Sequence, residues 1–184
     1  MRTLYFVFKK IFKKFIEPDL IEELRKNGMI IGMNFNMLPG VFIDFSHCWH
    51  ISVGDDVTLA PNVTILAHDA STKMHLNFTR IGKVTIGDRV FVGAGSIILP
   101  GVIVGNDVVI GAGSIVSRDL PDGVVAAGNP AKRIGDLKDF LTRKKKEMTL
   151  HPCFTKEFTL GGGVNAQRKS QMNLMMKDRI GFIV

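Results

Sequence analysis

The chain has 184 residues, a length that suits one domain. Apolar residues make up 46% of it, as in ordinary globular proteins. The sequence contains no uninterrupted apolar stretch of about 18 residues, so no membrane-spanning helix is expected. Its two cysteines, Cys48 and Cys153, lie far apart and suggest no disulfide framework, so we expect a cytoplasmic protein.

The formal net charge is +7, and it is unevenly distributed. The central residues 29–131 carry more acidic than basic side chains, whereas the two flanks are strongly basic. Solvated helix faces are the simplest explanation, and attraction of an anionic ligand or a membrane surface is the alternative. Nucleic-acid binding is not expected, because aromatic residues are not interleaved with the basic residues of the C-terminal part.

Residues 1–28 predict an N-terminal helical segment. Apolar residues recur at helical spacing through residues 3–16, with lysines on the opposite face. Pro18 interrupts this pattern, and a second short helix is expected over residues 19–26 before Asn27 and Gly28 end it. The apolar stripe is expected to pack on the rest of the protein or on a neighbouring subunit, and peripheral membrane contact is the alternative.

A period of six residues governs residues 29–131. Branched apolar residues recur at this spacing, and glycine follows most of them, where a larger Cβ would clash at a tight corner. The clearest run comprises Ile86, Val92, Ile98, Val104, Ile110 and Val116. The same frame returns at Val53, Leu59 and Ile65, and pairs at Val41–Phe45 and His47–Ile51 extend it weakly. This period predicts a mainly β fold, a parallel β-helix wound as a triangular prism with one block on each side.

An insertion interrupts the repeat. The distance from Ile65 to Ile86 does not fit a whole number of blocks, so we expect an inserted loop over residues 69–79, with Ile81 and Val84 resuming the prism. Insertions in such repeats form loops on one face, often the binding face.

Residues 132–184 predict a basic helical extension. A turn at residues 128–131 leaves the prism, and helices are expected over residues 136–148 and 165–177. An irregular stretch separates them, and the apolar end of the chain is expected to dock on the extension.

His68 ends a repeat block at the point where the inserted loop begins. A histidine at the edge of a rigid element, beside the only large insertion expected in the repeat, is a candidate for a functional role. Its imidazole can take a proton from a hydroxyl at neutral pH.

Two blocks of the repeat, IGDRVFVGAGSIILPGVIVG and VVIGAGSIVSRDLPDGVVAAGNPAKRI, resemble the hexapeptide-repeat acyltransferases. Within them, the chain is similar to bacterial sugar and capsular-polysaccharide O-acetyltransferases near the maltose and galactoside acetyltransferases. The resemblance implies a homotrimer of left-handed β-helices with active sites between subunits. It further implies acetyl-CoA as co-substrate, a sugar or glycan acceptor and no metal.

The resemblance also implies roles for single residues. His68 matches the general base, and the backbone N–H of Ala94 matches the donor that stabilises the oxyanion. The residues implied to bind the acetyl donor are Phe91, Ala94, Ala112, Ser117, Arg118, Lys132 and Arg133.

The acceptor side departs from the family pattern. PGVFIDFSHCW stands where the sugar acetyltransferases carry their acceptor-binding Asn and Asp. Asp44, His47 and Asp69 are therefore the candidate acceptor contacts, with His50 a weaker one. Asp69 also suits two other roles, orienting His68 or capping the turn of the loop.

Three alternatives stay open. A γ-carbonic-anhydrase-like zinc enzyme would use His47, His50, His68 and His75, although their spacing does not match that family. An N-acetyltransferase of an amino sugar would use the same general base. A non-catalytic solenoid that serves only for assembly would need no general base.

Overall fold

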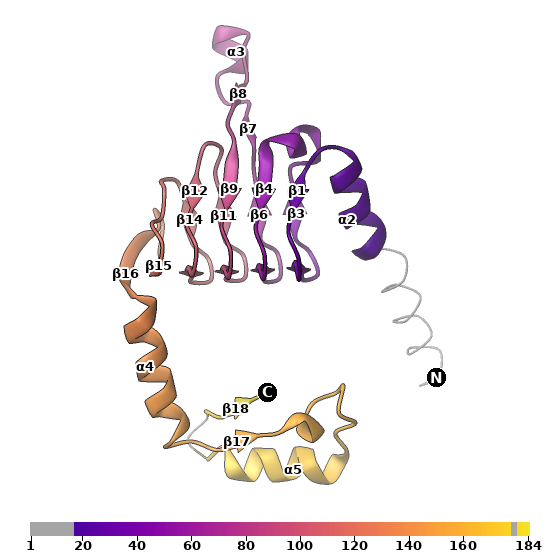
Figure 1. Cartoon of the computed structure of the whole chain (residues 1–184), viewed down its shortest axis with the longest axis vertical. Coiled ribbons are helices and arrows are strands. Elements are labelled where there is room, and N and C mark those ends of the chain that lie inside the picture. Colours follow the sequence, from indigo (N-terminus) through magenta and orange to yellow (C-terminus); the bar gives the residue numbers. More distant parts are fainter. Residues whose placement is uncertain (1–16, 178–179) are drawn as a thin grey trace. The chain divides into compact units, whose positions relative to one another are not determined.

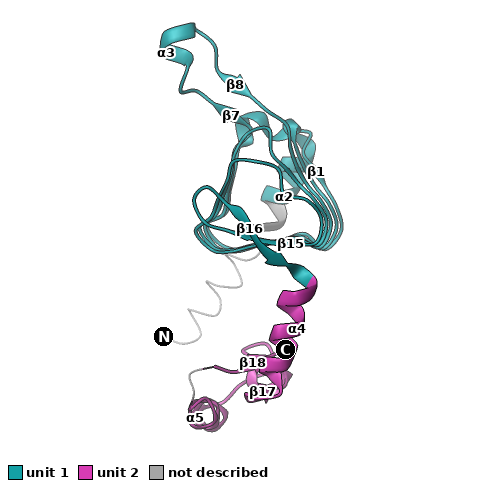
Figure 2. Cartoon of the chain, turned by 90° about the vertical axis from the view of Figure 1, so that its left-hand side faces the viewer, with its two compact units in different colours: residues 1–137 teal, residues 138–184 magenta. Residues whose placement is uncertain are grey.

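A computed structural model describes residues 17–177 and 180–184 (Figure 1). It contains two compact units, residues 1–137 and 138–184 (Figure 2). The helix predicted over residues 3–16 lies outside the described residues. In the part of the chain that is described, no helix has both the length and the apolar character needed to cross a membrane.

The first unit is a parallel β-helix with three sheets, and the chain visits them in turn (Figure 1). The first sheet contains β1 (Ile30–Ile31), β4 (Ile51–Val53), β9 (Val84–Ile86) and β12 (Ile103–Val104). The second contains β2 (Asn36–Met37), β5 (Thr58–Leu59), β10 (Phe91–Val92), β13 (Val109–Ile110), β15 (Val124–Ala127) and the antiparallel β16 (Lys132–Asp136). The third contains β3 (Phe42–Ile43), β6 (Thr64–Ile65), β11 (Ile97–Ile98) and β14 (Ile115–Val116).

The six-residue period places the same residue type at the same point of successive coils. Ile65 pairs with Ile98, which pairs with Val116, and all three side chains are fully buried inside the prism. The predicted β-helix is confirmed. The glycines that follow inward residues allow the coils to stack closely: a Cβ on Gly93 would lie 2.4 Å from the backbone nitrogen of Ala112 in the next coil.

Two details of the predicted repeat are wrong. Ile43 is the inward residue of the third sheet, whereas Phe45 is exposed and begins η1 (Phe45–His50), a 3₁₀ helix that interrupts the coil before β4. Ile81 does not resume the prism, because β8 (Arg80–Ile81) pairs antiparallel with β7 (His68–Asp69) and leaves its side chain exposed. In both places an insertion changes which residues face inward.

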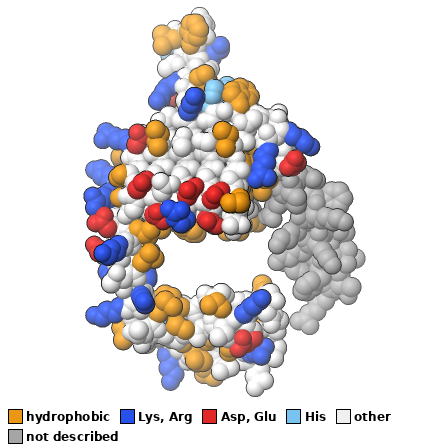
Figure 3. Space-filling view, in the orientation of Figure 1, with side chains coloured by type: hydrophobic (Ala, Val, Ile, Leu, Met, Phe, Trp, Pro, Cys, Tyr) orange, Lys and Arg blue, Asp and Glu red, His pale blue; other side chains and the backbone are white. Residues whose placement is uncertain are grey.

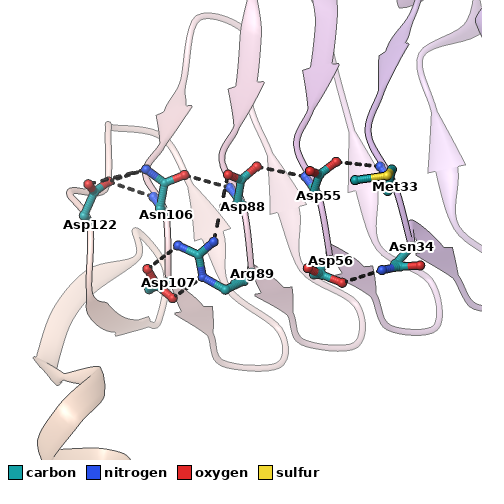
Figure 4. Close-up of polar contacts among 9 residues, drawn as sticks. All are labelled: Met33, Asn34, Asp55, Asp56, Asp88, Arg89, Asn106, Asp107 and Asp122. Carbon is teal, nitrogen blue, oxygen red and sulfur yellow. Dashed lines mark hydrogen bonds and ion pairs between the residues drawn. The ribbon is translucent and has the colours of Figure 1, made fainter.

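A ladder of side-chain hydrogen bonds runs along the corner between the first and second sheets (Figure 4). In each coil a backbone N–H donates to the side-chain oxygen of the corner residue in the next coil. The bonds run from Met33 to Asp55 (2.6 Å), Asp55 to Asp88 (2.9 Å), Asp88 to Asn106 (2.8 Å) and Asn106 to Asp122 (2.7 Å). This corner therefore has its turn amides paired within the protein.

Helix α2 (Glu17–Lys26) precedes the prism and begins earlier than the predicted residue 19. Pro18 lies in its first turn, where proline needs no hydrogen-bonded N–H, so it does not break the helix. Leu24 of α2 is buried in the core of the first unit.

The second unit contains α4 (Leu137–Met148), β17 (Cys153–Phe154), η2 (Lys156–Phe158), α5 (Ala166–Met175) and β18 (Phe182–Ile183). The apolar end of the chain forms β18, which pairs in parallel with β17. Asn165 caps α5, since its side-chain oxygen accepts the N–H of Arg168 at 2.9 Å.

Candidate active site

His68 lies where the prism gives way to the inserted loop. It follows β6 and begins β7, and β7 and β8 form the two-stranded stem of a projection that carries α3 (Lys73–Leu76) at its tip (Figures 1 and 2). About a third of the His68 side chain is exposed. The rigid coil fixes its backbone, and the imidazole remains accessible to a ligand.

Asp44 forms a hydrogen bond with the imidazole of His68 on its buried side. Its Oδ2 atom lies 2.5 Å from Nδ1 of His68 and accepts the N–H of Ala67 at 3.0 Å. Its Oδ1 atom accepts the hydroxyl of Ser46 at 2.8 Å. Asp44 is 1% exposed, so both oxygens are used inside the protein.

The Asp44 carboxyl stays ionised at neutral pH. Burial alone would raise the pKa of Asp44, but hydrogen bonds from Ser46, His68 and the Ala67 N–H outweigh it and hold the pKa below its ordinary value. The stability that this carboxylate contributes is therefore present above the ordinary carboxyl pKa. It is lost as the pH falls through the lowered value.

His47 lies beside this pair. The ring centroids of His47 and His68 are 4.8 Å apart, and Nδ1 of His47 lies 2.9 Å from the Ser46 hydroxyl. Ser46, which the sequence analysis did not single out, thus links Asp44 to His47. The structure therefore brings His68 together with two of the three residues expected to contact the acceptor.

The structure places Asp44 and Asp69, two of the candidate acceptor contacts, in different settings. The structure buries Asp44 under His68, where an acceptor has no access to it. Asp69 instead accepts the N–H of Ser71 at 2.9 Å and caps the turn of the loop, a bond that also lowers the pKa of Asp69. Asp44, and not Asp69, orients His68.

Ala94 and Ala112 lie on another edge, the corner between the second and third sheets. Both are exposed, and neither backbone N–H has an acceptor within residues 17–177 and 180–184. The preceding coils carry Pro39 and Pro61 at the same turn position, and Gly95 accordingly stacks on Pro61, with its N–H donating to the Pro61 carbonyl at 2.9 Å. Unlike the ladder corner of Figure 4, this edge thus offers free backbone donors at two successive coils.

The other residues expected at the donor site fall on both edges. Phe91 is exposed on β10, and Lys132 pairs with Ala127 across β15 and β16, at the end of the Ala94–Ala112 edge. Arg133 is exposed but forms an ion pair with Asp136 at 2.6 Å. Ser117 and Arg118 are exposed on the same edge as His68, the corner between the third and first sheets.

The third sheet separates these two edges within one chain. Because Ile97 pairs with Thr64, Ala94 is level with Pro61, and His68 lies seven residues further on. The chain crosses the whole third sheet in these seven residues, which at about 3.3 Å per extended residue span up to roughly 23 Å. One copy of the chain therefore does not bring His68 and Ala94 to the same reacting atom.

The cluster also contains donors suited to a metal. Ligand atoms of Asp44, His47 and His68 lie within 4.8 Å of one another, a set that suits a zinc-like ion. Among the described residues, His50 and His75 do not join this group.

The fold and the matched sequences define the class of protein. Residues 83–118 match the family described as "Hexapeptide repeat of succinyl-transferase". Protein CapG of Staphylococcus aureus is 40% identical over 141 residues, which cover 73% of this chain and 82% of CapG. Galactoside O-acetyltransferase of Escherichia coli is 36% identical over 129 residues, which cover 67% of this chain and 61% of that enzyme.

A solved structure of an acetyltransferase is also similar to this chain. A galactoside acetyltransferase in complex with coenzyme A aligns with a TM-score of 0.51 and 32% identity, covering 61% of this chain and 67% of that chain. The prism is therefore a left-handed β-helix. The chain belongs to the hexapeptide-repeat acyltransferases, and it is an acyltransferase.

Proposed function

We propose that the chain is an acetyl-CoA-dependent O-acetyltransferase that acts on a hydroxyl of a sugar or surface-polysaccharide precursor, with His68 as general base. The observation that carries this proposal is the partly exposed imidazole held by a buried, ionised carboxylate. Relatives named for O-acetylation of galactosides support the acceptor class, and a coenzyme A complex of one supports the donor.

The geometry suits direct transfer of the acetyl group. With its Nδ1–H donated to Asp44, the neutral imidazole presents Nε2 as a proton acceptor. Nε2 takes the proton of the acceptor hydroxyl as its oxygen attacks the thioester carbonyl. The tetrahedral oxyanion then accepts the free N–H of Ala94 from a second copy of the chain. Its collapse breaks the carbon–sulfur bond, and the proton on His68 passes to the leaving thiolate, giving an acetyl ester and free coenzyme A.

A homotrimer would bring the two edges together. Phe42, Ile97 and Ile115 project outward from the third sheet, and Phe42 is 54% exposed. If this apolar face turns toward a three-fold axis, the His68 edge of each copy meets the Ala94 edge of the next. We infer that each active site forms between two copies.

The same arrangement supports the expected donor site. In it, the Ala112 N–H and the Phe91 ring would contact the pantetheine arm from the Ala94 edge, and Lys132 would attract the coenzyme A phosphates. Ser117 and Arg118 would approach from the partner's His68 edge. Arg133 would need to exchange its ion pair with Asp136 for a phosphate, which an exposed pair permits at small cost.

Replacing Asp44 by Asn tests the role of the buried carboxylate. The variant is expected to lower kcat by roughly a hundredfold, because an amide can hold the imidazole in the wrong tautomer or displace it. The KM for acetyl-CoA should stay the same. A steady-state assay over a pH series checks this, and an unchanged kcat at every pH would show that Asp44 serves packing alone.

The activity itself is tested by thiol release from acetyl-CoA with galactosides, maltose, nucleotide sugars and amino sugars as acceptors. We expect an acetyl ester on a sugar hydroxyl, identified by mass spectrometry and by its lability to mild base. An amide product would show an N-acetyltransferase instead. Stoichiometric zinc in the purified protein without thiol release would favour the metalloenzyme for which Asp44, His47 and His68 supply ligands.

A further inference from the structure

A row of rings extends from His68 along η1. The centroid of His47 lies 4.8 Å from His68 and 5.5 Å from Trp49, and Trp49 lies 5.6 Å from His50. Figure 3 shows histidine and hydrophobic atoms side by side at the base of the projection. Trp49 is 54% exposed, which is high for a large aromatic side chain in a well-packed unit.

The backbone that carries this ring is firmly held. Cys48 is fully buried, its Sγ lies 3.5 Å from the carbonyl of Asn27, and its own carbonyl accepts the N–H of Ile51. A Cβ on Gly28 would lie only 3.0 Å from Cβ of Trp49, so the chain before β1 packs directly against this residue. Trp49 is thus exposed on a rigid support, which suits a binding surface better than a mobile loop does.

We propose that the indole of Trp49 is the platform on which a pyranose ring of the acceptor stacks, and this inference rests on the proposed function. A pyranose has a flat face of C–H groups and an equator of hydroxyls, and it suits an exposed aromatic plane with polar groups at its side. Trp49 supplies the plane, and the imidazoles of His47 and His50 flank it. The ring spacing would let a sugar hydroxyl reach Nε2 of His68 while the same or the adjoining sugar unit covers Trp49.

This geometry assigns a substrate class. The acceptors are cyclic sugars or their glycosides, and acyclic polyols bind poorly because they have no flat face to stack. His47 takes part through its free Nε2, since its Nδ1 is occupied by the Ser46 hydroxyl. The platform lies on the acceptor side of the base, apart from the residues expected to bind acetyl-CoA.

Trp49 is the chain's only tryptophan, so its fluorescence reports on this position alone. Excited at 295 nm without acetyl-CoA, the full chain is titrated with methyl β-galactoside, maltose and sorbitol. We expect a saturable change in emission with the two cyclic sugars, half-complete near their KM as acceptors, and none with sorbitol. Unchanged emission with a sugar that the enzyme acetylates would overturn the inference.

Kinetics of Trp49→Ala provide the second test. The variant is expected to raise the KM for cyclic acceptors at least about tenfold, with kcat and the KM for acetyl-CoA unchanged, and Trp49→Phe should restore most of the affinity. Ile30→Ala, which truncates an exposed apolar residue on β1, is the matched control. Equal KM values for the wild type and Trp49→Ala would reject the platform and leave the proposed function intact. Thiol release with none of the sugars would reject both.

Discussion

Replacing His68 by Ala is expected to lower kcat by about two to four orders of magnitude, the usual range for removal of a general base. The acceptor hydroxyl would then have to lose its proton to water. The KM for acetyl-CoA should change little, because the residues expected to bind the donor lie elsewhere. Steady-state kinetics with thiol detection measure both quantities.

His75→Ala is the matched control, since His75 lies in α3 on the same projection and outside the cluster of Asp44, His47 and His68. It should retain the wild-type kcat. Sedimentation of the His68→Ala variant should show the wild-type oligomer. A smaller species would mean that His68 serves assembly, and an unchanged kcat would exclude it as the base.

Replacing Ala94 by Pro is expected to lower kcat by about two to three orders of magnitude, the effect of losing one oxyanion donor. Proline replaces the amide hydrogen at this position with a ring carbon, so it removes the donor. The backbone should accept it, because Pro39 and Pro61 already occupy the same turn position in the two preceding coils. Pro39, Pro61 and Ala94 are each followed by a residue with positive φ, as in a type II turn, which favours proline at its second position.

Ala112→Pro makes the same change one coil further along. Its N–H is expected to contact the pantetheine arm, so the variant should raise the KM for acetyl-CoA a few-fold and keep most of kcat. Circular dichroism and thermal unfolding check that both proline variants fold. Equal losses of kcat in a folded Ala94→Pro and a folded Ala112→Pro would contradict a specific oxyanion role for Ala94.

The fold could be predicted because the six-residue period reports directly on burial. Each inward side chain stacks on its equivalents, as Ile65 does on Ile98, so the pattern repeats in the sequence. The prediction was wrong where an insertion breaks this relation, at Phe45 and Ile81. A helical insertion and an antiparallel stem leave no periodic signal.

The candidate site was less accessible to sequence reasoning. The position of His68 at the end of a block could be found, but its pairing with Asp44 could not, because the two are 24 residues apart. The register would have indicated it: Ile43 stacks on Ile65, so the next residue, Asp44, lies beside the start of the loop. Because the sequence analysis took Phe45 as the inward residue, it did not predict that Asp44 lies beside His68. The proposed three-fold assembly would depend on the outer face of the third sheet, which the inward repeat does not describe.

The proposed site takes its base from one copy of the chain and its oxyanion donor from the next. Differently tagged His68→Ala and Ala94→Pro chains can be co-expressed and the mixed oligomers purified through both tags. Every mixed trimer should regain wild-type chemistry at about one third of its sites, since a ring that contains both kinds of chain has one junction where an intact His68 meets an intact Ala94. Activity no higher than that of either variant alone would mean that both groups act within one chain, and it would contradict the account.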